Sequence, residues 1–433
     1  MRNALSIFLL FSSFTSAFAA DVPTTQSLEK PLTERATTVQ KLFRDKPSGY
    51  GKFFADSFRA AVPDEKLTSI FSNYFKSYGK CTDIRLSQRI DASTGIFEFT
   101  FDKGFTAPVT LAIDVREPHK ITGLLIGAAA ERVASFDDII KKLKSLPGTT
   151  SLLAQQLDAK PDAKVLGAHN ADKSLAIGST FKLYILAQLV KEIEAGQRQW
   201  SDVIALDEAA KSLPSGQLQD WPEKSPLTLH TLASMMISRS DNTAADQLLR
   251  TLGRQNVEAI QKETGHAAPE KNVPFLSTLE MFKLKGVPNL AEKYLPLDAS
   301  RRRSMLDQDL PKVSRQAVGG LTEPKYIDQL EWFATAQDLA RLMNYLRQHT
   351  EKAPASAARA ILAINPGLSP DKTHFPFVAY KGGSEAGVLN LTFLLKSKSN
   401  HWYALSATWN NPAAPLDDQQ LLSLLQSSFN LLD

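Results

Sequence analysis

The chain is poor in cysteine and has no long hydrophobic segment. Its 433 residues contain one cysteine, Cys81, which excludes an intramolecular disulfide framework and any metal site built from several thiolates. An excess of one charge is also lacking, since 50 basic and 46 acidic side chains leave a net charge of +4. So small an excess argues against nucleic acid as a partner. We therefore expect a folded protein of about two or three domains, held together by its hydrophobic cores, with no metal site and no cofactor.

The first residues have the pattern of a secretory signal peptide. Arg2 precedes an apolar run from Ile7 to Phe14, and an A-x-A cleavage pattern ends at Ala19. The run is shorter than the roughly 20 residues that span a bilayer, and no cysteine follows it for lipid attachment. We expect residues 1–20 to be removed and the protein to be exported, periplasmic or secreted, with no stable membrane anchor. Polar residues 21–38 are predicted to be a linker.

A small domain is predicted over residues 39–132. The apolar spacing from Val39 to Tyr78 is typical of helices. Three segments of alternating apolar residues follow, at 96–101, 109–115 and 121–126, separated by turn residues. Helices followed by an antiparallel meander predict an α+β domain.

A larger domain is predicted over residues 133–433. Strand patterns lie at both of its ends, at 150–157, 164–169, 377–381, 388–395 and 402–409. Helical patterns lie between and after them, at 179–265, 335–349 and 417–432, with a loop-rich stretch at 267–330. If the five strands form one sheet, the helical middle must stand beside it.

Serine and lysine lie one helical turn apart at Ser179 and Lys182. Residues i and i+3 share a face of a helix, and a serine hydroxyl becomes a nucleophile when a neighbouring base takes its proton. A buried lysine with a lowered pKa can be that base. The pair alone is also compatible with a helix cap beside a solvated lysine.

Two further short motifs follow in the chain. Ser240, Asp241 and Asn242 follow an apolar helix and offer either a second hydroxyl and an amide for the nucleophile, or a plain helix–helix turn. Lys381 is followed by two glycines and Ser384 near the end of a predicted strand. Glycines there allow a substrate backbone to approach as an added strand, and the lysine is a cation for a substrate carboxylate. A hairpin turn is the alternative.

The order S-x-x-K, S-D-N, K-G-G resembles the serine β-lactamase and penicillin-binding protein superfamily, whose signature is S-x-x-K, S-D-N and K-T-G. The segments 213–216 and 227–246 resemble the S-D-N region of class A β-lactamases. The layout of the whole chain, with segments 274–278 and 281–285, resembles a smaller branch, typified by the two-domain β-lactamase-like serine hydrolase of clavulanic acid biosynthesis. The resemblance implies an α/β/α sandwich with an antiparallel five-stranded sheet flanked by helices. It also implies a first domain like the steroid isomerase/NTF2 fold.

The resemblance also implies roles for the motif residues. Ser179 would be acylated, Lys182 would be its base, and Ser240 would pass a proton to the leaving group. The substrate-binding residues would be Asn242, Lys381, Gly382, Gly383 and Ser384. The backbone N–H groups of Ser179 and Ser384 would form the oxyanion hole. The partner would be a small molecule bearing a carboxylate, and we expect a monomer.

The sequence departs from the superfamily pattern in two places. No E-x-x-L-N segment, which carries the deacylating glutamate of class A enzymes, is recognised between the second and third motifs. Glu323, Asp328 and Glu331 lie in that interval as replacement bases or as solvated loop charges. Gly382 stands in place of threonine in the third motif. Ser277 or Thr278 is expected either to line the site or to pack within a loop.

Three functions therefore remain open from the sequence. The first is an acyl-transfer hydrolase acting on a β-lactam or a related ester or amide. The second is a peptidoglycan D-Ala carboxypeptidase-like enzyme. The third is a protein that keeps the fold and binds a β-lactam or another ligand without turnover, which the missing glutamate favours.

Overall fold

The computed structural model describes residues 29–127, 129–159, 162–368 and 370–432. The chain divides into two compact units between Arg132 and Val133. The predicted signal peptide, residues 1–20, lies outside the described residues. None of the described helices combines the length and the apolar character needed to cross a membrane.

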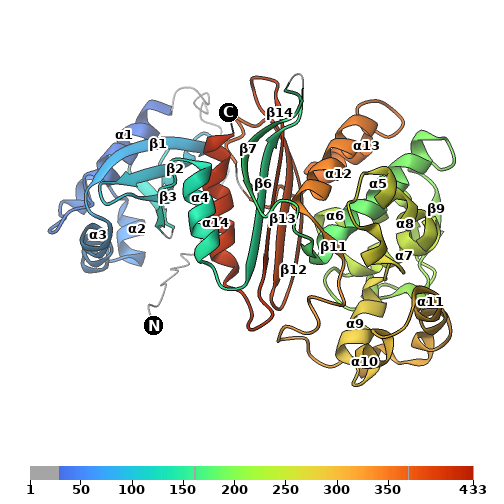
Figure 1. Ribbon diagram of the computed structural model, residues 1–433. Helices are drawn as coiled ribbons and strands as arrows, with labels where there is room; N and C mark the ends of the chain where they lie inside the picture. Colours follow the sequence, from blue (N-terminus) through green and yellow to red (C-terminus); the bar gives the residue numbers. More distant parts are fainter. Residues whose placement is uncertain (1–28, 128, 160–161, 369, 433) are drawn as a thin grey trace. The chain divides into compact units, whose positions relative to one another are not determined.

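The first unit consists of helices followed by an antiparallel sheet (Figure 1). Its strands follow one another in the order β1-β2-β3-β4, and the short β5 pairs with β3. Aromatic side chains fill its core, where Phe43 makes edge contacts with Phe71, Phe99 and Phe101. The elements are α1 (Glu29–Gln40), α2 (Asp56–Ala61), α3 (Asp64–Tyr78), β1 (Cys81–Arg89), β2 (Thr94–Phe101), β3 (Phe105–Ile113), β4 (Ile121–Ile126) and β5 (Ala130–Glu131).

One prediction for this unit needs correction, and one strand was missed. The predicted linker 21–38 is wrong for residues 29–38, which lie in helix α1 and bury Leu32 and Ala36 in the core. Strand β1 was not predicted, because it lies at the edge of the sheet and alternates polar residues with few apolar ones. The likeness of this unit to the steroid isomerase/NTF2 fold stays a prediction.

The second unit is built on one antiparallel sheet of five strands, as the sequence predicts. The strand order is β12-β13-β14-β6-β7, so the first two strands of the unit join the last three. Strand β13 is buried along nearly its whole length, which agrees with its mostly apolar sequence, interrupted by Asn390 and Thr392. The strands are β6 (Thr149–Gln156), β7 (Lys164–His169), β12 (Phe377–Glu385), β13 (Val388–Lys396) and β14 (Trp402–Asn410).

Helices cover both faces of this sheet (Figure 1). Helices α4 (Phe136–Ser145) and α14 (Asp418–Ser428) pack on one face, and α12 (Ala336–His349) packs on the other. Helix α12 begins with the predicted capping box of Thr335 and Asp338. The other helices of the unit are α5 (Lys182–Glu194), α6 (Leu229–Ser238), α7 (Asn242–Leu252), α8 (Arg254–Glu263), α9 (Thr278–Gly286), α10 (Leu290–Tyr294), α11 (Ala299–Gln308) and α13 (Ala357–Ala363).

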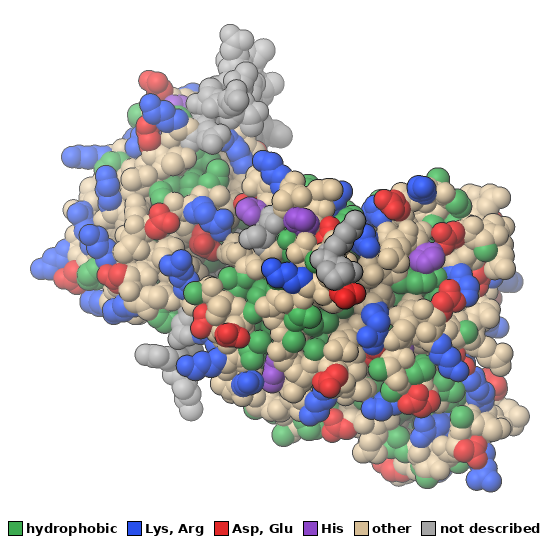
Figure 2. Space-filling view, turned by 45° about the horizontal axis from the view of Figure 1, so that its top comes forward, with side chains coloured by type: hydrophobic (Ala, Val, Ile, Leu, Met, Phe, Trp, Pro, Cys, Tyr) green, Lys and Arg blue, Asp and Glu red, His purple; other side chains and the backbone are tan. Residues whose placement is uncertain are grey.

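The predicted loop-rich stretch 267–330 contains three helices, α9 to α11. Two small sheets also lie outside the five-stranded one, formed by β8 (Leu175–Ala176) with β11 (Phe333–Ala334) and by β9 (Val203–Ala205) with β10 (Pro226–Thr228). Basic and acidic side chains are interspersed over the face drawn in Figure 2. That distribution agrees with the small net charge and shows no field of one sign on this face.

Candidate active site

The S-x-x-K motif lies where a short 3₁₀ helix, Gly178–Phe181, continues into α5. The one-turn spacing brings the lysine nitrogen of Lys182 to 3.2 Å from the hydroxyl oxygen of Ser179. Lys182 is fully buried, whereas Ser179 is partly exposed. The alternative of a helix cap beside a solvated lysine is therefore wrong.

Lys182 also contacts two residues of the S-D-N motif. Its nitrogen lies 2.6 Å from the backbone oxygen of Ser240, 3.2 Å from the Ser240 hydroxyl and 2.6 Å from Oδ1 of Asn242. Burial lowers the pKa of Lys182 to about 7, although the charges of Asp246 and Asp241 oppose the shift. A neutral amine has two N–H groups and one lone pair. When the two N–H groups donate to the two acceptors at 2.6 Å, the lone pair remains to accept the proton of Ser179.

Ser240 is held in an unusual backbone conformation between α6 and α7. Its φ of 54° lies in the left-handed region, which is costly for a residue other than glycine. The next residue, Asp241, caps α7 through Ala244 N–H and also accepts the N–H groups of Gln217 and Leu218. These bonds fix the turn, so that both the carbonyl and the hydroxyl of Ser240 face Lys182.

Lys381 comes from strand β12 and approaches the same serine. Its nitrogen donates to the Ser240 hydroxyl at 3.0 Å and to the backbone oxygen of Gly382. Burial and the charge of Lys182 hold the pKa of Lys381 well below its usual value. The Ser240 hydroxyl is thus within hydrogen-bond distance of two lysine nitrogens. Contact of Lys381 with a substrate carboxylate stays a prediction.

The second glycine of K-G-G lets β12 touch the segment that carries Ser179. A Cβ on Gly383 would lie 2.1 Å from the oxygen of Ile177 and 2.4 Å from the nitrogen of Ser179. The nitrogen of Ser384 would lie 3.0 Å from a Cβ on Gly178. No side chain fits at 383, and the segments that carry the backbone nitrogens of Ser179 and Ser384 are in direct contact. The role of these two N–H groups as an oxyanion hole stays a prediction. The motif lies within β12, so the hairpin-turn alternative is wrong.

The first glycine of K-G-G accommodates a tyrosine. A Cβ on Gly382 would lie 2.0 Å from the hydroxyl oxygen of Tyr380, and one on Gly367 would lie 2.4 Å from its ring. The ring also packs on Phe393, with centroids 4.8 Å apart. The hydroxyl of Tyr380 therefore occupies the place where the side chain of a K-T-G threonine would begin.

The segment that contains Ser277 and Thr278 lies next to the site. Residues 273–277 read V-P-F-L-S, which matches E-x-x-L-N only at the leucine. Phe275 makes an edge contact with Phe181, the residue before Lys182, with centroids 5.8 Å apart. Ser277 caps α9, and the hydroxyl of Thr278 bonds the Ser212 hydroxyl at 2.6 Å. Ser277 therefore has a packing role at the start of α9, whereas the Thr278 hydroxyl also donates to the backbone oxygen of Asn242 at 3.4 Å.

The three acidic candidates for a replacement base lie in different surroundings. Glu323 and Asp328 are exposed, in agreement with solvated loop charges. Glu331 is buried and paired with Lys285 at 2.5 Å, so that interpretation is wrong for Glu331. Lys285 also pairs with Glu385, the residue after Ser384, at 2.5 Å. Glu385 was not predicted, because a residue just after a motif carries no signal of its partners.

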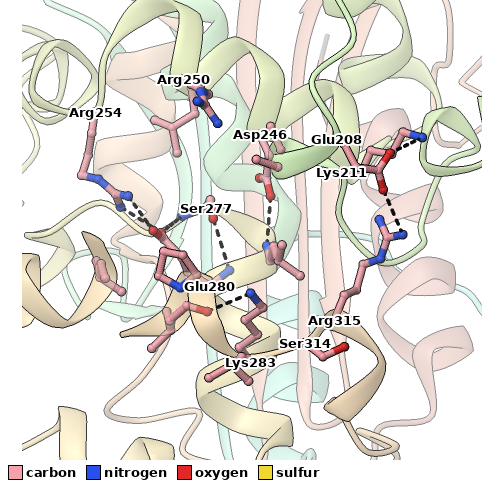
Figure 3. A pocket seen from close by; sticks show the side chains of 18 of the residues that line it. Glu208, Lys211, Asp246, Arg250, Arg254, Ser277, Glu280, Lys283, Ser314 and Arg315 are labelled. Atoms are coloured by element: carbon pink, nitrogen blue, oxygen red, sulfur yellow. Dashed lines mark hydrogen bonds and ion pairs between the residues drawn. The ribbon is translucent and has the colours of Figure 1, made fainter. Parts of the chain in front are cut away.

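A cavity of about 690 Å³ lies beside α7 and α9 (Figure 3). Its basic side chains are largely paired with acids, as Arg254 is with Glu280 and Lys211 with Glu208. None of the predicted catalytic or substrate-binding residues lines it. Asp246 borders the cavity and accepts the N–H groups of Thr278 and Leu279. The described residues contain no group of three or more His, Cys, Asp or Glu side chains able to hold a metal ion.

The chain is similar to several solved structures. The β-lactamase from Sphaerobacter thermophilus DSM 20745 is 19% identical, with 69% of this chain and 97% of that chain covered and a TM-score of 0.49. The β-lactamase from Desulfarculus baarsii DSM 2075 is 17% identical, with 69% and 99% covered and a TM-score of 0.48. The structure of PBP-A is 17% identical, with 68% and 94% covered and a TM-score of 0.47.

No curated protein matches the chain. The family described as the beta-lactamase enzyme family matches residues 133–419, the greater part of the chain and nearly all of the second unit. The chain therefore belongs to the beta-lactamase enzyme family.

Proposed function

We propose that this protein is an exported serine hydrolase that acts through an acyl-enzyme on Ser179. The observation that carries the proposal is the position of the Lys182 nitrogen, within 3.2 Å of the hydroxyls of Ser179 and Ser240 and 2.6 Å from Oδ1 of Asn242. A base beside a serine hydroxyl, itself oriented by further polar groups, is the arrangement of an activated nucleophile.

Acylation begins when the neutral amine of Lys182 takes the proton of Ser179. The Ser179 oxygen forms a bond to the substrate carbonyl carbon, and the carbonyl oxygen becomes an oxyanion that the N–H groups of Ser179 and Ser384 stabilise. The C–N or C–O bond to the leaving group then breaks. Ser240 gives its proton to the leaving atom and regains one from Lys182, so no proton is gained or lost.

The substrate class follows from the charges and the strand at the site. The backbone of β12 beside Gly383 can pair with an extended amide. Lys381 offers an amine whose protonated form a substrate carboxylate would stabilise, and Ser384 and Asn242 offer a hydroxyl and an amide. We propose a β-lactam or a related ester or amide that bears a carboxylate. We also propose that the protein is a monomer.

Slow turnover is a second candidate function, and Val273 favours it. V-P-F-L-S has valine in the place of the glutamate of E-x-x-L-N, so this loop offers no carboxylate to activate water. In that case the protein would retain the acyl group and act as a binding protein.

The experiment is to incubate the purified protein with a fluorescent penicillin and measure its intact mass. We expect a covalent adduct on the wild type and none on Ser179→Ala. Ser201→Ala, a change at an exposed serine, is the matched control and should be labelled normally. Absence of label on the wild type, or label on Ser179→Ala, would overturn the proposal. Turnover of a chromogenic cephalosporin in the same tube separates a hydrolase from a protein that keeps the adduct.

A further inference from the structure

A buried ionic cluster lies beside the site without belonging to the motifs. The nitrogen of Lys285 is 2.5 Å from a carboxylate oxygen of Glu331 and 2.5 Å from one of Glu385. The side chains of Lys285 and Glu331 are 1% and 0% exposed, and that of Glu385 is 21% exposed. Removing three ionisable groups from water is costly. Their retention in one place therefore calls for an explanation beyond filling the core.

The cluster forms one hydrogen-bonded unit. The carboxyl groups of Glu331 and Glu385 each accept a hydrogen bond from the Lys285 nitrogen. Burial and the charge of Glu331 raise the pKa of Glu385 well above its usual value, although Lys285 opposes this. Burial alone would lower the pKa of Lys285, but the two carboxylates outweigh it and raise that pKa. Lys285 thus joins the two carboxyl groups in one unit.

The carboxyl group of Glu385 lies next to the backbone of Ser384, which offers one of the two N–H groups of the proposed oxyanion hole. Glu385 directly follows Ser384 and is the last residue of β12. It lies on the same face of the strand as Gly383, the residue that touches the nitrogen of Ser179. Holding the side chain of Glu385 therefore fixes the end of the strand at the position of the Ser384 N–H group.

The carboxyl group of Glu331 is linked through Trp332 to the segment of Ser179, which offers the other N–H group. Glu331 accepts the N–H group of Trp332 at 3.2 Å. The carbonyl of Trp332 in turn accepts the N–H group of Ile177 at 3.0 Å. The Trp332 ring stacks on Phe181 with centroids 3.8 Å apart. Trp332 thus contacts the chain on both sides of Ser179, and Glu331 holds Trp332.

We propose that Lys285, Glu331 and Glu385 position the two N–H groups of the oxyanion hole relative to each other. The inference rests on the proposed acyl transfer at Ser179. The three side chains are positioning residues, because each acts through the backbone next to it. The consequence for catalysis is specific, since both acylation and deacylation form an oxyanion in the same hole. A displaced N–H group must slow the two steps together, by about 10- to 100-fold.

The experiment compares Glu385→Gln and Glu331→Gln with the wild type. Stopped-flow and intact-mass measurements give the rate of acylation by a β-lactam and the rate of loss of the adduct. We expect both rates to fall by similar factors. The double variant should be little slower than the slower single variant, because the two residues act as a unit.

The matched control is Glu192→Gln, which breaks another largely buried ion pair, with Arg198, at the end of α5. It should lower the melting temperature and leave both rates unchanged. Glu385→Asp is the second variant in case a glutamine variant fails to fold. It keeps the carboxyl group but shortens the reach, and should slow both steps too.

Two kinetic outcomes would overturn the inference. Unchanged rates in both glutamine variants would remove the positioning role. Slower deacylation with normal acylation would make Glu385 a base for water instead. Hydrogen exchange of residues 382–386, measured without substrate, tests positioning even if the wild type is never acylated and the proposed function fails. We expect faster exchange in both variants than in Glu192→Gln, and equal protection would overturn the inference.

Discussion

The hydroxyl of Tyr380 lies 2.0 Å from the point where a Cβ on Gly382 would stand. Both residues lie on one face of β12, two positions apart, and burial raises the pKa of Tyr380 to about 12. The departure from K-T-G is therefore more than a lost hydroxyl. The space of the threonine side chain is already filled by a tyrosine whose ring packs on Phe393.

Restoring the threonine should harm the protein. Gly382→Thr must push the Tyr380 ring away from Phe393 and Gly367, and overpacking of this kind costs about 1–3 kcal/mol. Urea unfolding should show that loss, with no gain in affinity for a β-lactam. In Tyr380→Ala the space is open, so adding Gly382→Thr to that variant should cost less. Equal costs in the two backgrounds would contradict the clash.

Acylation should depend on pH through Lys182. Its pKa is about 7, and only the neutral amine can accept the Ser179 proton. The acylation rate should therefore fall about tenfold per pH unit below that pKa and reach a plateau above it. Stopped-flow acylation between pH 5 and pH 9 measures the profile, and a flat profile would contradict the role of Lys182 as base.

Asp246→Asn is the control for this profile. The charge of Asp246 favours the ammonium form of Lys182, so its removal should shift the inflection to lower pH. Burial raises the pKa of Asp246 itself to about 7, and the variant also removes that second titration. An inflection at higher pH would show that Asp246 does not act on Lys182 through its charge.

The motifs and most of the sheet could be predicted because their signals are local. The i, i+3 spacing of Ser179 and Lys182, the alternation in the strands and the capping pair at Thr335 each depend on a few neighbouring residues. Most residues of strand β1 are polar, so it lacks the alternation of apolar residues from which the other three long strands of its sheet were predicted. The helices within 267–330 were missed because loop-like and charged residues outweigh their short apolar patterns.

The contacts around the site could not be predicted, because they join residues far apart in the chain. Lys285 meets Glu385 across 100 positions, and nothing in the sequence near either residue marks the pairing. Glu331 was interpreted through its charged surroundings in the chain, yet its side chain is fully buried. Tyr380 fills the space above Gly382 because two residues far apart in the chain, 367 and 382, are glycines and have no Cβ to collide with it.

Thr180 should contribute to stability through one buried hydrogen bond. Its hydroxyl donates to Oδ1 of Asn390 at 2.7 Å and joins the nucleophile segment to β13. Thr180→Val keeps the shape and removes the donor, and should cost about 1–2 kcal/mol. Thr251→Val, which removes a bond to the preceding helical turn, should cost less. Urea unfolding of both variants measures the difference, and equal costs would contradict a special anchor at Thr180.

A carboxylate at position 273 should speed deacylation. Val273 stands where E-x-x-L-N has its glutamate. Two residues further on, the ring of Phe275 contacts the ring of Phe181, the residue before Lys182. Val273→Glu would give water a general base, which contributes typically about 10²–10⁴-fold. We expect the adduct on Ser179 to decay at least about tenfold faster, with acylation unchanged, as measured by intact mass over time. Val273→Gln has nearly the same size without the base and should keep the wild-type lifetime. If the two variants lose the acyl group at the same rate, the loop does not face the ester, and the slow step must depend on groups elsewhere.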